Sequence, residues 1–436
     1  MTIKGPLKGL FGWLAHRVFA TYFLVPICAT IIAAPIAYLF LAADDEGLSG
    51  WVLSSDIPLV ASGKAAQEYA SVLTGVNAAL LTLYFSITLL VLTIAAANLG
   101  VRLIDRWLDK RLIRVSLAGL CFNLVFSLVL LAAVDPDASG TGLPQGTLWI
   151  SLLLFLLNLS MLTVALHDLG RTMYVDKAVS KIAEDAGEKG TQIASALPHK
   201  GTWNTSIAAK RDGYVEGIDL EELAKCFKDG TGKVHIAVAP GQHVLEGETV
   251  LRAAETDLPE KQICRAIPIG PYRSNSQGAV FQIRLLVEIA ARALSPAVND
   301  FYSAIAAADR LTSVMANQKD LWIEDGEIAV SALDNRFELA GQDFRGLFED
   351  PMNAFRQAAA DYPSVSIRMI GNLARLTRQL SEESASAGLL RYLHRLAEEL
   401  AEHAKSRAQT DYDRQAIARS LDAFEGLAQA SETGNA

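Results

Sequence analysis

The sequence predicts an α-helical membrane protein with four transmembrane helices, followed by a cytoplasmic α+β region made of a small barrel-sandwich-like β module and a helical bundle. Three observations support this fold class. Four long apolar stretches lie within residues 1–170 of the 436. After these stretches come short segments in which apolar and polar residues alternate, as in strands, with glycines between them. The last third of the chain has apolar residues at helical spacing. The positive mean hydropathy of the whole chain, +0.24, agrees with membrane-spanning segments.

The four apolar stretches are long enough to span a bilayer, because a helix needs about 20 apolar residues to cross the hydrocarbon core. The first contains Pro26 and Pro35, which predict a kink unless neighbouring groups compensate. It is too long for the apolar part of a signal peptide, so we interpret it as a retained span. The predicted spans are residues 18–43, 75–99, 115–134 and 147–167.

Lysine and arginine gather on one side of this topology. They occur in the N-terminal segment, between the second and third spans, and after the fourth span. By contrast, residues 44–74 contain only Lys64, and residues 135–146 contain neither lysine nor arginine. Because cytoplasmic loops hold the excess of basic residues, we expect both termini in the cytoplasm. The chain is then a multi-pass protein of the bacterial cytoplasmic (inner) membrane, in contact with the lipid bilayer.

Four basic residues between the second and third spans recur at every fourth position, which places them on one stripe of a helix. They are Arg102, Arg106, Lys110 and Arg114. Two interpretations stay open. The stripe is ordinary anchoring on the cytoplasmic side, or it contacts an anionic lipid or substrate, since each basic residue near an anionic surface contributes about 1 kcal/mol.

Uncharged polar residues fall near the middle of the predicted spans, where Asp, Glu, Lys and Arg are absent. Without ionisable groups there, proton-coupled transport is not favoured. The polar residues either form hydrogen bonds between helices or line a pore, in which case Asn158→Leu abolishes flux. The residues of this predicted layer are Thr82, Ser86, Asn123 and Asn158.

A compact β module is predicted over residues 205–270, where glycines alternate with short strands. The glycine and valine spacing resembles the barrel-sandwich hybrid of biotinyl, lipoyl and membrane-fusion adaptor domains. Carrier domains of that kind present a modified lysine at a hairpin tip within a short signature. Lys225, Lys228 and Lys233 lack this signature, so we expect a structural module and no cofactor.

The segment "ALSPAVND" breaks a strong helix predicted over residues 279–294. Pro296 disfavours helical conformation at Ser295 and so ends the helix. Asn299 or Asp300 can then cap a following helix, whose first N–H groups need acceptors. The stretch therefore predicts a corner between two helices.

The same segment, with "LVEIAARAL" before it, resembles the signature of a bacterial family of predicted membrane proteins, the domain of unknown function 2254. The resemblance extends to "YFSITLLVLTIAAANLGVRLIDRWLDKRLI" and to "DGYVEGID", and thus covers most of residues 70–320. Relatives carry an Arg-Thr-x-x-Gln-Asp element before the signature helix. In "RSNSQGA", Arg273 and Gln277 match it, whereas Ser274 and Gly278 differ. The resemblance implies the architecture but no activity.

The C-terminal region, residues 278–430, is predicted to be rich in helices that form a bundle or an oligomer contact. A stretch around Asp334 and Asn335 predicts one or two strands. After Pro351 the apolar positions recur at helical spacing, with charged residues on the other face. One apolar stripe consists of Leu389, Leu393, Leu396 and Leu400.

Motifs of catalysis and metal binding are absent from the sequence. It has no P-loop, no G-x-G-x-x-G, no H-E-x-x-H and no G-x-S-x-G. The four cysteines lack paired spacing, and we interpret His235 and His243 as surface histidines. We therefore predict no catalytic, cofactor-binding or metal-ligating residues. The formal charge of −9 argues against a nucleic-acid partner.

Two functions fit this organisation better than an enzyme does. The first is a homo-oligomeric channel or pore with a cytoplasmic regulatory domain, an order that resembles small-conductance mechanosensitive channels in layout only. The alternative is a membrane-anchored scaffold or sensor that recruits a cytoplasmic protein partner without transport.

Overall fold

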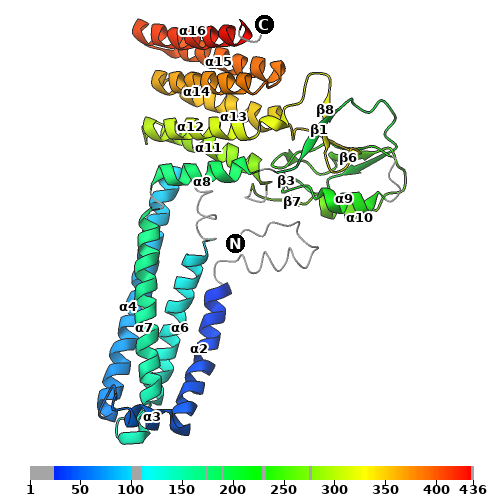
Figure 1. Ribbon diagram of the computed structural model, residues 1–436. Helices are drawn as coiled ribbons and strands as arrows, with labels where there is room; N and C mark the ends of the chain where they lie inside the picture. The colour runs from blue at the N-terminus through cyan, green and yellow to red at the C-terminus, as the bar shows by residue number, and fades with distance from the viewer. Residues whose placement is uncertain are drawn as a thin grey trace. The chain divides into compact units, whose positions relative to one another are not determined.

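The computed structural model describes residues 24–100, 110–171, 174–188, 190–227, 232–273 and 277–433. The chain divides into two compact units. We call the first, which ends at Tyr174, the membrane unit. The second begins at Val175 and also includes Asn98–Gly100; we call it the mixed unit, because it combines helices and sheets. Figure 1 shows the elements of each unit.

Four long apolar helices form the membrane unit. They are α2 (Leu24–Ala43), α4 (Gly63–Leu99), α6 (Arg111–Ala133) and α7 (Gln145–Arg171). Each is long and apolar enough to cross a membrane. A π-helical segment η1 (Asp44–Leu48) and the short helix α3 (Ser49–Ser54) follow α2, and a 3-10 turn η2 (Gly140–Gly142) precedes α7.

These helices correspond to the four predicted spans, with different ends. Residues 18–23 of the first predicted span lie outside the described residues. Helix α4 begins at Gly63 and not at residue 75, because its first turns contain alanine, lysine and glutamate, which favour a helix although they are not membrane-like. Apolar length therefore located the spans, but helix propensity decided where α4 begins.

The membrane unit packs through large apolar side chains. Tyr84, Leu117 and Leu162 are buried where α4, α6 and α7 meet. On α2, Phe40 contacts Phe126 of α6, with ring centres 6.3 Å apart. Large apolar residues such as Leu39 remain exposed (68%), as expected for a face that contacts lipid tails.

The mixed unit contains two sheets. The larger has the strand order β1-β8-β9-β4-β6-β2 and the smaller the order β5-β3-β7. Strand β4 pairs with β9 in parallel, and the other described pairs are antiparallel. The strands are β1 (Ile193–Ala196), β2 (Thr205–Ala208), β3 (Gly213–Val215), β4 (Val234–Ile236), β5 (His243–Val244), β6 (Thr249–Ala253), β7 (Ile269–Gly270), β8 (Ile328–Ser331) and β9 (Phe337–Leu339).

The larger sheet extends beyond the predicted module of residues 205–270. Strand β1 comes from before this range. Strands β8 and β9 come from the helix-rich region of residues 278–430, where the stretch around Asp334 and Asn335 predicted one or two strands. They join because buried side chains of all these strands, such as Ile236, Leu251 and Phe337, share one core with helices α9 (Leu220–Cys226) and α10 (Glu260–Ala266). Local alternation cannot show such long-range pairing, and the barrel-sandwich comparison stays a resemblance.

Layered helices form the rest of the mixed unit (Figure 1). Helix α8 contacts α11 and α12, α12 contacts α14, and α14 contacts α15 and α16. The predicted leucine stripe is buried on α15. The helices are α8 (Val175–Gly187), α11 (Ala279–Ala293), α12 (Phe301–Asn317), α13 (Phe344–Ala359), α14 (Pro363–Glu382), α15 (Ala387–Arg407) and α16 (Asp411–Thr433), with the 3-10 turn η4 (Lys319–Leu321) after α12.

Candidate functional site

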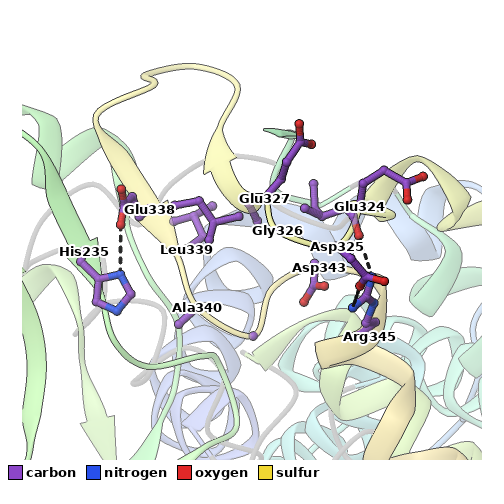
Figure 2. A pocket seen from close by; sticks show the side chains of 14 residues that line it. His235, Glu324, Asp325, Gly326, Glu327, Glu338, Leu339, Ala340, Asp343 and Arg345 are labelled. Carbon is purple, nitrogen blue, oxygen red and sulfur yellow. Dashed lines mark hydrogen bonds and ion pairs between the residues drawn. The ribbon is translucent and has the colours of Figure 1, made fainter. Parts of the chain in front are cut away.

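An acidic pocket lies in the mixed unit where β9, the turn before β8 and the start of α13 meet (Figure 2). Its volume is about 280 Å³. Five carboxylate residues and one arginine line it, together with His235 and small or apolar residues. The charged residues are Glu324, Asp325, Glu327, Glu338, Asp343 and Arg345. We call this cavity the acidic pocket.

Glu338 is the buried carboxylate of the acidic pocket, with 5% of its surface exposed. Its Oε1 accepts a hydrogen bond from the backbone N–H of His199 at 2.9 Å. Its Oε2 lies 3.4 Å from Nδ1 of His235, because parallel pairing places these two residues opposite each other on β9 and β4 (Figure 2). Trp203 lies beside both histidine rings, 4.8 Å from His199 and 5.9 Å from His235 between ring centres.

Arg345 organises the rim of the pocket. Its Nη1 lies 2.6 Å from Asp325 Oδ1, and its Nη2 donates to the carbonyl of Ile323 at 3.1 Å. The guanidinium lies 4.4 Å from the centre of the Trp322 ring. Asp343 caps α13 by accepting from the N–H of Gly346 at 3.2 Å. Cation–π and charge-assisted contacts of this kind hold the rim in place.

The arrangement suits a positively charged ligand. Five carboxylates against one guanidinium give the acidic pocket an excess of negative charge, and carboxylate oxygens are the ligands that hard cations and ammonium groups prefer. A volume of about 280 Å³ is at or below the lower end of small-molecule sites. The size and charge of the pocket are compatible with a small cation.

Sequence reasoning missed this pocket. Alternation along Phe337-Glu338-Leu339 predicts an outward-facing glutamate, and the acidic run at residues 324–327 resembles a solvated loop. In the structure all three residues of β9 are buried, because the chain around His199 covers the outer face of the strand. His235, interpreted as a surface histidine, is only 30% exposed at its side chain. The one feature of the sequence that indicated the pocket was Glu338, a charged residue between two apolar residues of a predicted strand.

The four residues of the predicted polar layer do not line one common surface in the membrane unit. Asn123 and Asn158 are buried, whereas Thr82 and Ser86 are exposed on the outer face of α4. The hydroxyls of Thr82 and Ser86 each donate to the carbonyl four residues earlier, both at 2.9 Å. Helical periodicity instead turns Asn77, which is not part of the predicted layer, to the inner face.

Asn77 links two membrane helices. Its Oδ1 accepts from Asn123 Nδ2 at 3.1 Å, and its Nδ2 donates to Ser127 Oγ at 3.3 Å. Asn158 donates to the carbonyl of Leu154 at 2.9 Å and lies so close to Gly119 that a Cβ there would be 2.3 Å from Asn158 Oδ1. Asn77 and Asn123 thus hydrogen-bond between α4 and α6, whereas Asn158 bonds within α7 and packs against α6.

A second buried carboxylate, Asp44, anchors the start of α7. It is 5% exposed and accepts hydrogen bonds from the N–H groups of Gly146 and Thr147, both at 2.8 Å. Thr147 Oγ1 and Ser49 Oγ donate to it at 2.5 and 2.7 Å. An anionic side chain at a helix N-terminus satisfies otherwise unpaired donors, so Asp44 has a structural role.

The basic stripe is described only in part. Arg102 and Arg106 lie outside the described residues. Lys110 Nζ is 2.9 Å from Asp168 Oδ2 of α7, and Arg114 lies in the first turn of α6. Lys110 therefore forms an ion pair within the membrane unit, and its side chain remains 37% exposed.

The predicted corner lies between α11 and α12. Ser295 and Pro296 follow the end of α11, and Asn299 adopts a left-handed conformation with φ +50°. Asp300 caps α12 by accepting from the N–H of Ser303 at 3.1 Å. Its own N–H donates to the carbonyl of Ala293 at 2.7 Å. The corner joins the two helices, and its residues are not among those that line the acidic pocket.

Comparisons with known proteins agree with this architecture. The model of the family "Predicted membrane protein (DUF2254)" matches residues 20–375. Uncharacterized proteins of Mycobacterium bovis and Mycobacterium tuberculosis are each 26% identical over 269 residues, which cover 56% of this chain and 51% of the relative. The chain thus spans about half the length of these relatives. No solved structure matches it.

Proposed function

The chain belongs to the DUF2254 family of predicted membrane proteins, and from that premise we propose that it is a membrane-anchored sensor. In this proposal the membrane unit anchors the chain in the bacterial cytoplasmic membrane. The mixed unit lies in the cytoplasm, where it binds a small cationic ligand in the acidic pocket and recruits a protein partner. The role is non-enzymatic. The distribution of lysine and arginine supports the orientation.

The observation that supports sensing is the buried carboxylate of Glu338 on the wall of the acidic pocket. A buried carboxylate costs free energy unless it is paired and hydrogen-bonded. Glu338 obtains the N–H of His199 and the ring of His235 as partners, and it still faces a cavity of about 280 Å³. A preformed acidic cavity of this size is a ready site for a cation.

The membrane unit supports anchoring and not a path through a single chain. The amides of Asn77 and Asn123 bond to each other, and Asn158 packs on Gly119. These contacts engage one polar atom of Asn123 and the side chain of Asn77, while Oδ1 of Asn123 and Oδ1 of Asn158 are buried with no hydrogen-bond partner among the described residues. A path between subunits would require an oligomer.

We expect Mg²⁺, Ca²⁺ or a diamine such as putrescine to raise the melting temperature of the full-length protein in mild detergent. A ligand at 100 times its Kd stabilises the folded state by about 2.7 kcal/mol. The ions and the diamine are separate arms that distinguish a metal from an organic cation. Glu327→Gln removes one carboxylate of the rim and should weaken binding about five- to tenfold, or about 1 kcal/mol.

The matched control is Glu382→Gln, which removes the same charge from an exposed position outside the pocket. It should leave the melting response unchanged. A response equal in Glu327→Gln and wild type, or no response to any of the three probes, would contradict the sensor proposal.

A homo-oligomeric channel is the second candidate, favoured by the exposed hydroxyl stripe of α4. Thr82, Ser86 and Thr93 all lie on the outer face, where several copies around an axis could line a path. Each hydroxyl bonds to its own helix, which also permits contact with lipid.

The channel candidate requires a ring of subunits, which the particle mass in nanodiscs measures. Flux into liposomes should then fall with Thr82→Val combined with Ser86→Ala. Asn158→Leu, which the sequence suggested as the test, instead disturbs packing against Gly119. A monomer, or flux unchanged in the double variant, would contradict the channel.

A further inference from the structure

Two neighbouring helices of the mixed unit bring together three side chains of the types that bind metal ions. His394 and Glu398 are four positions apart on α15, and Glu425 comes from α16. The ligand atoms of the three residues all lie within 4.8 Å of one another. Helices α15 and α16 pack against each other at the top of the helical stack in Figure 1. The cluster therefore connects two helices and is separate from the acidic pocket.

The spacing is close to that of a coordinated ion. Donor atoms about 2.0–2.2 Å from a tetrahedral zinc ion lie about 3.3–3.6 Å from one another. His394 Nδ1 and Glu398 Oε2 are 3.6 Å apart. The Glu398 side chain is 50% exposed, so its carboxylate can rotate without displacing the core. The other donor pairs, all within 4.8 Å, would have to approach by about 1 Å to reach tetrahedral spacing.

The position of His394 is supported by the core beneath it. Its ring lies against the ring of Phe424, with centres 5.1 Å apart and planes inclined by 32°. Phe424 is buried, with 1% of its surface exposed, and it directly precedes Glu425 in the chain. The contact orients the imidazole beside the carboxylate of α16. A preoriented imidazole is the arrangement that metal sites use.

The donor set selects a class of ion. One imidazole nitrogen and two carboxylates suit Zn²⁺ and similar transition ions. Calcium requires six to eight oxygen ligands, and magnesium requires near-ideal octahedral geometry. Three protein ligands also leave a fourth tetrahedral position for water.

We propose that His394, Glu398 and Glu425 form a site for a zinc-class divalent metal ion that ties α16 to α15. The His394–Glu398 contact by itself is also a common helical ion pair at i, i+4. The participation of Glu425 from the second helix distinguishes the metal site from such a pair. The residues matched by the family model end at 375, so the site lies in the segment that follows them.

Titration calorimetry of the full-length, metal-free protein in detergent with ZnCl₂ tests the site. We expect one Zn²⁺ per chain and a higher melting temperature with zinc. His394→Ala and Glu425→Gln should each weaken zinc binding by about 10- to 100-fold. His403→Ala is the matched control, because His403 lies on the same helix but contacts Arg356 at 2.6 Å; its zinc affinity should equal that of wild type.

Co²⁺ gives a second readout that does not depend on variants. A four-coordinate site should produce ligand-field absorption much stronger than that of aqueous Co²⁺, which excess Zn²⁺ abolishes. Absence of this absorption in the wild type, absence of stoichiometric Zn²⁺, or wild-type zinc affinity in Glu425→Gln would each overturn the proposal. We expect Glu327→Gln, which changes the acidic pocket, to bind zinc like the wild type, and this result would show that the two sites are distinct.

Discussion

Replacing Asp44 with asparagine is expected to lower the free energy of unfolding of the membrane unit by about 3 kcal/mol, since hydrogen bonds to a charged group contribute about 1.5–3 kcal/mol each. Asp44 accepts from two backbone N–H groups at the start of α7 and from two hydroxyls. Asparagine has one oxygen acceptor, so its NH₂ group would face a donor. At least one buried N–H then loses its partner.

The measurement is unfolding of the full-length protein in mixed micelles as the fraction of SDS rises, followed by circular dichroism. Asp45→Asn is the matched control, because Asp45 is adjacent and exposed and its replacement should change the unfolding free energy by less than about 0.5 kcal/mol. Equal effects of the two substitutions would show that local charge, and not the cap on α7, determines stability. A Ser49→Ala variant should reproduce part of the loss, because Ser49 Oγ donates to Asp44 and also accepts from the N–H of Gln145 at 3.0 Å.

Gly346→Ala is the second substitution with a large expected effect, a loss of about 2–3 kcal/mol from the mixed unit. A Cβ at Gly346 would lie 2.2 Å from the carbonyl oxygen of Gly341, 2.4 Å from its carbon and 2.7 Å from its Cα. All three are backbone atoms, so a rotamer change cannot relieve the clash. Gly341 itself has φ +64° and lines the acidic pocket.

The displaced segment would also move Asp343, which lies between the two glycines and caps α13. We therefore expect Gly346→Ala to lower the melting temperature and to weaken the response to cations together. Gly371→Ala is the control, since a Cβ at this helical position of α14 has no neighbour within 4 Å. That substitution should be neutral or stabilise by up to about 1 kcal/mol. A melting temperature for Gly346→Ala equal to that of the control would contradict the close backbone contact.

The corner between α11 and α12 shows which features residues close in sequence can predict. Proline at 296 and an acidic residue at 300 were enough to predict where one helix ends and the next begins. The structure adds that Tyr362, just before α14, donates its hydroxyl proton to the carbonyl of Leu294 at 2.5 Å. This contact fixes the corner against another helix, and no spacing within the segment indicates it.

The sequence predicted the membrane spans much better than it predicted which polar side chains lie together, either in the spans or in the acidic pocket. Thr82, Ser86, Asn123 and Asn158 share a depth in the predicted spans, but depth does not specify the direction in which a side chain points. The rotation of α4 turned Asn77 inward and Thr82 outward. The burial of Glu338 could not be predicted from its strand either, because the residues that cover β9 come from around His199, far earlier in the chain.

The sequence by itself determined four membrane-spanning helices, the change to short strands after them, and the helical character of the C-terminal region. These features depend on apolar length, periodicity and turn residues, which are properties of neighbours along the chain. Only the tertiary structure decided that β1, β8 and β9 join one sheet with β4, and that Glu338 and His235 face each other in a cavity. Pairing of distant segments depends on which surfaces bury one another, and that information is not local.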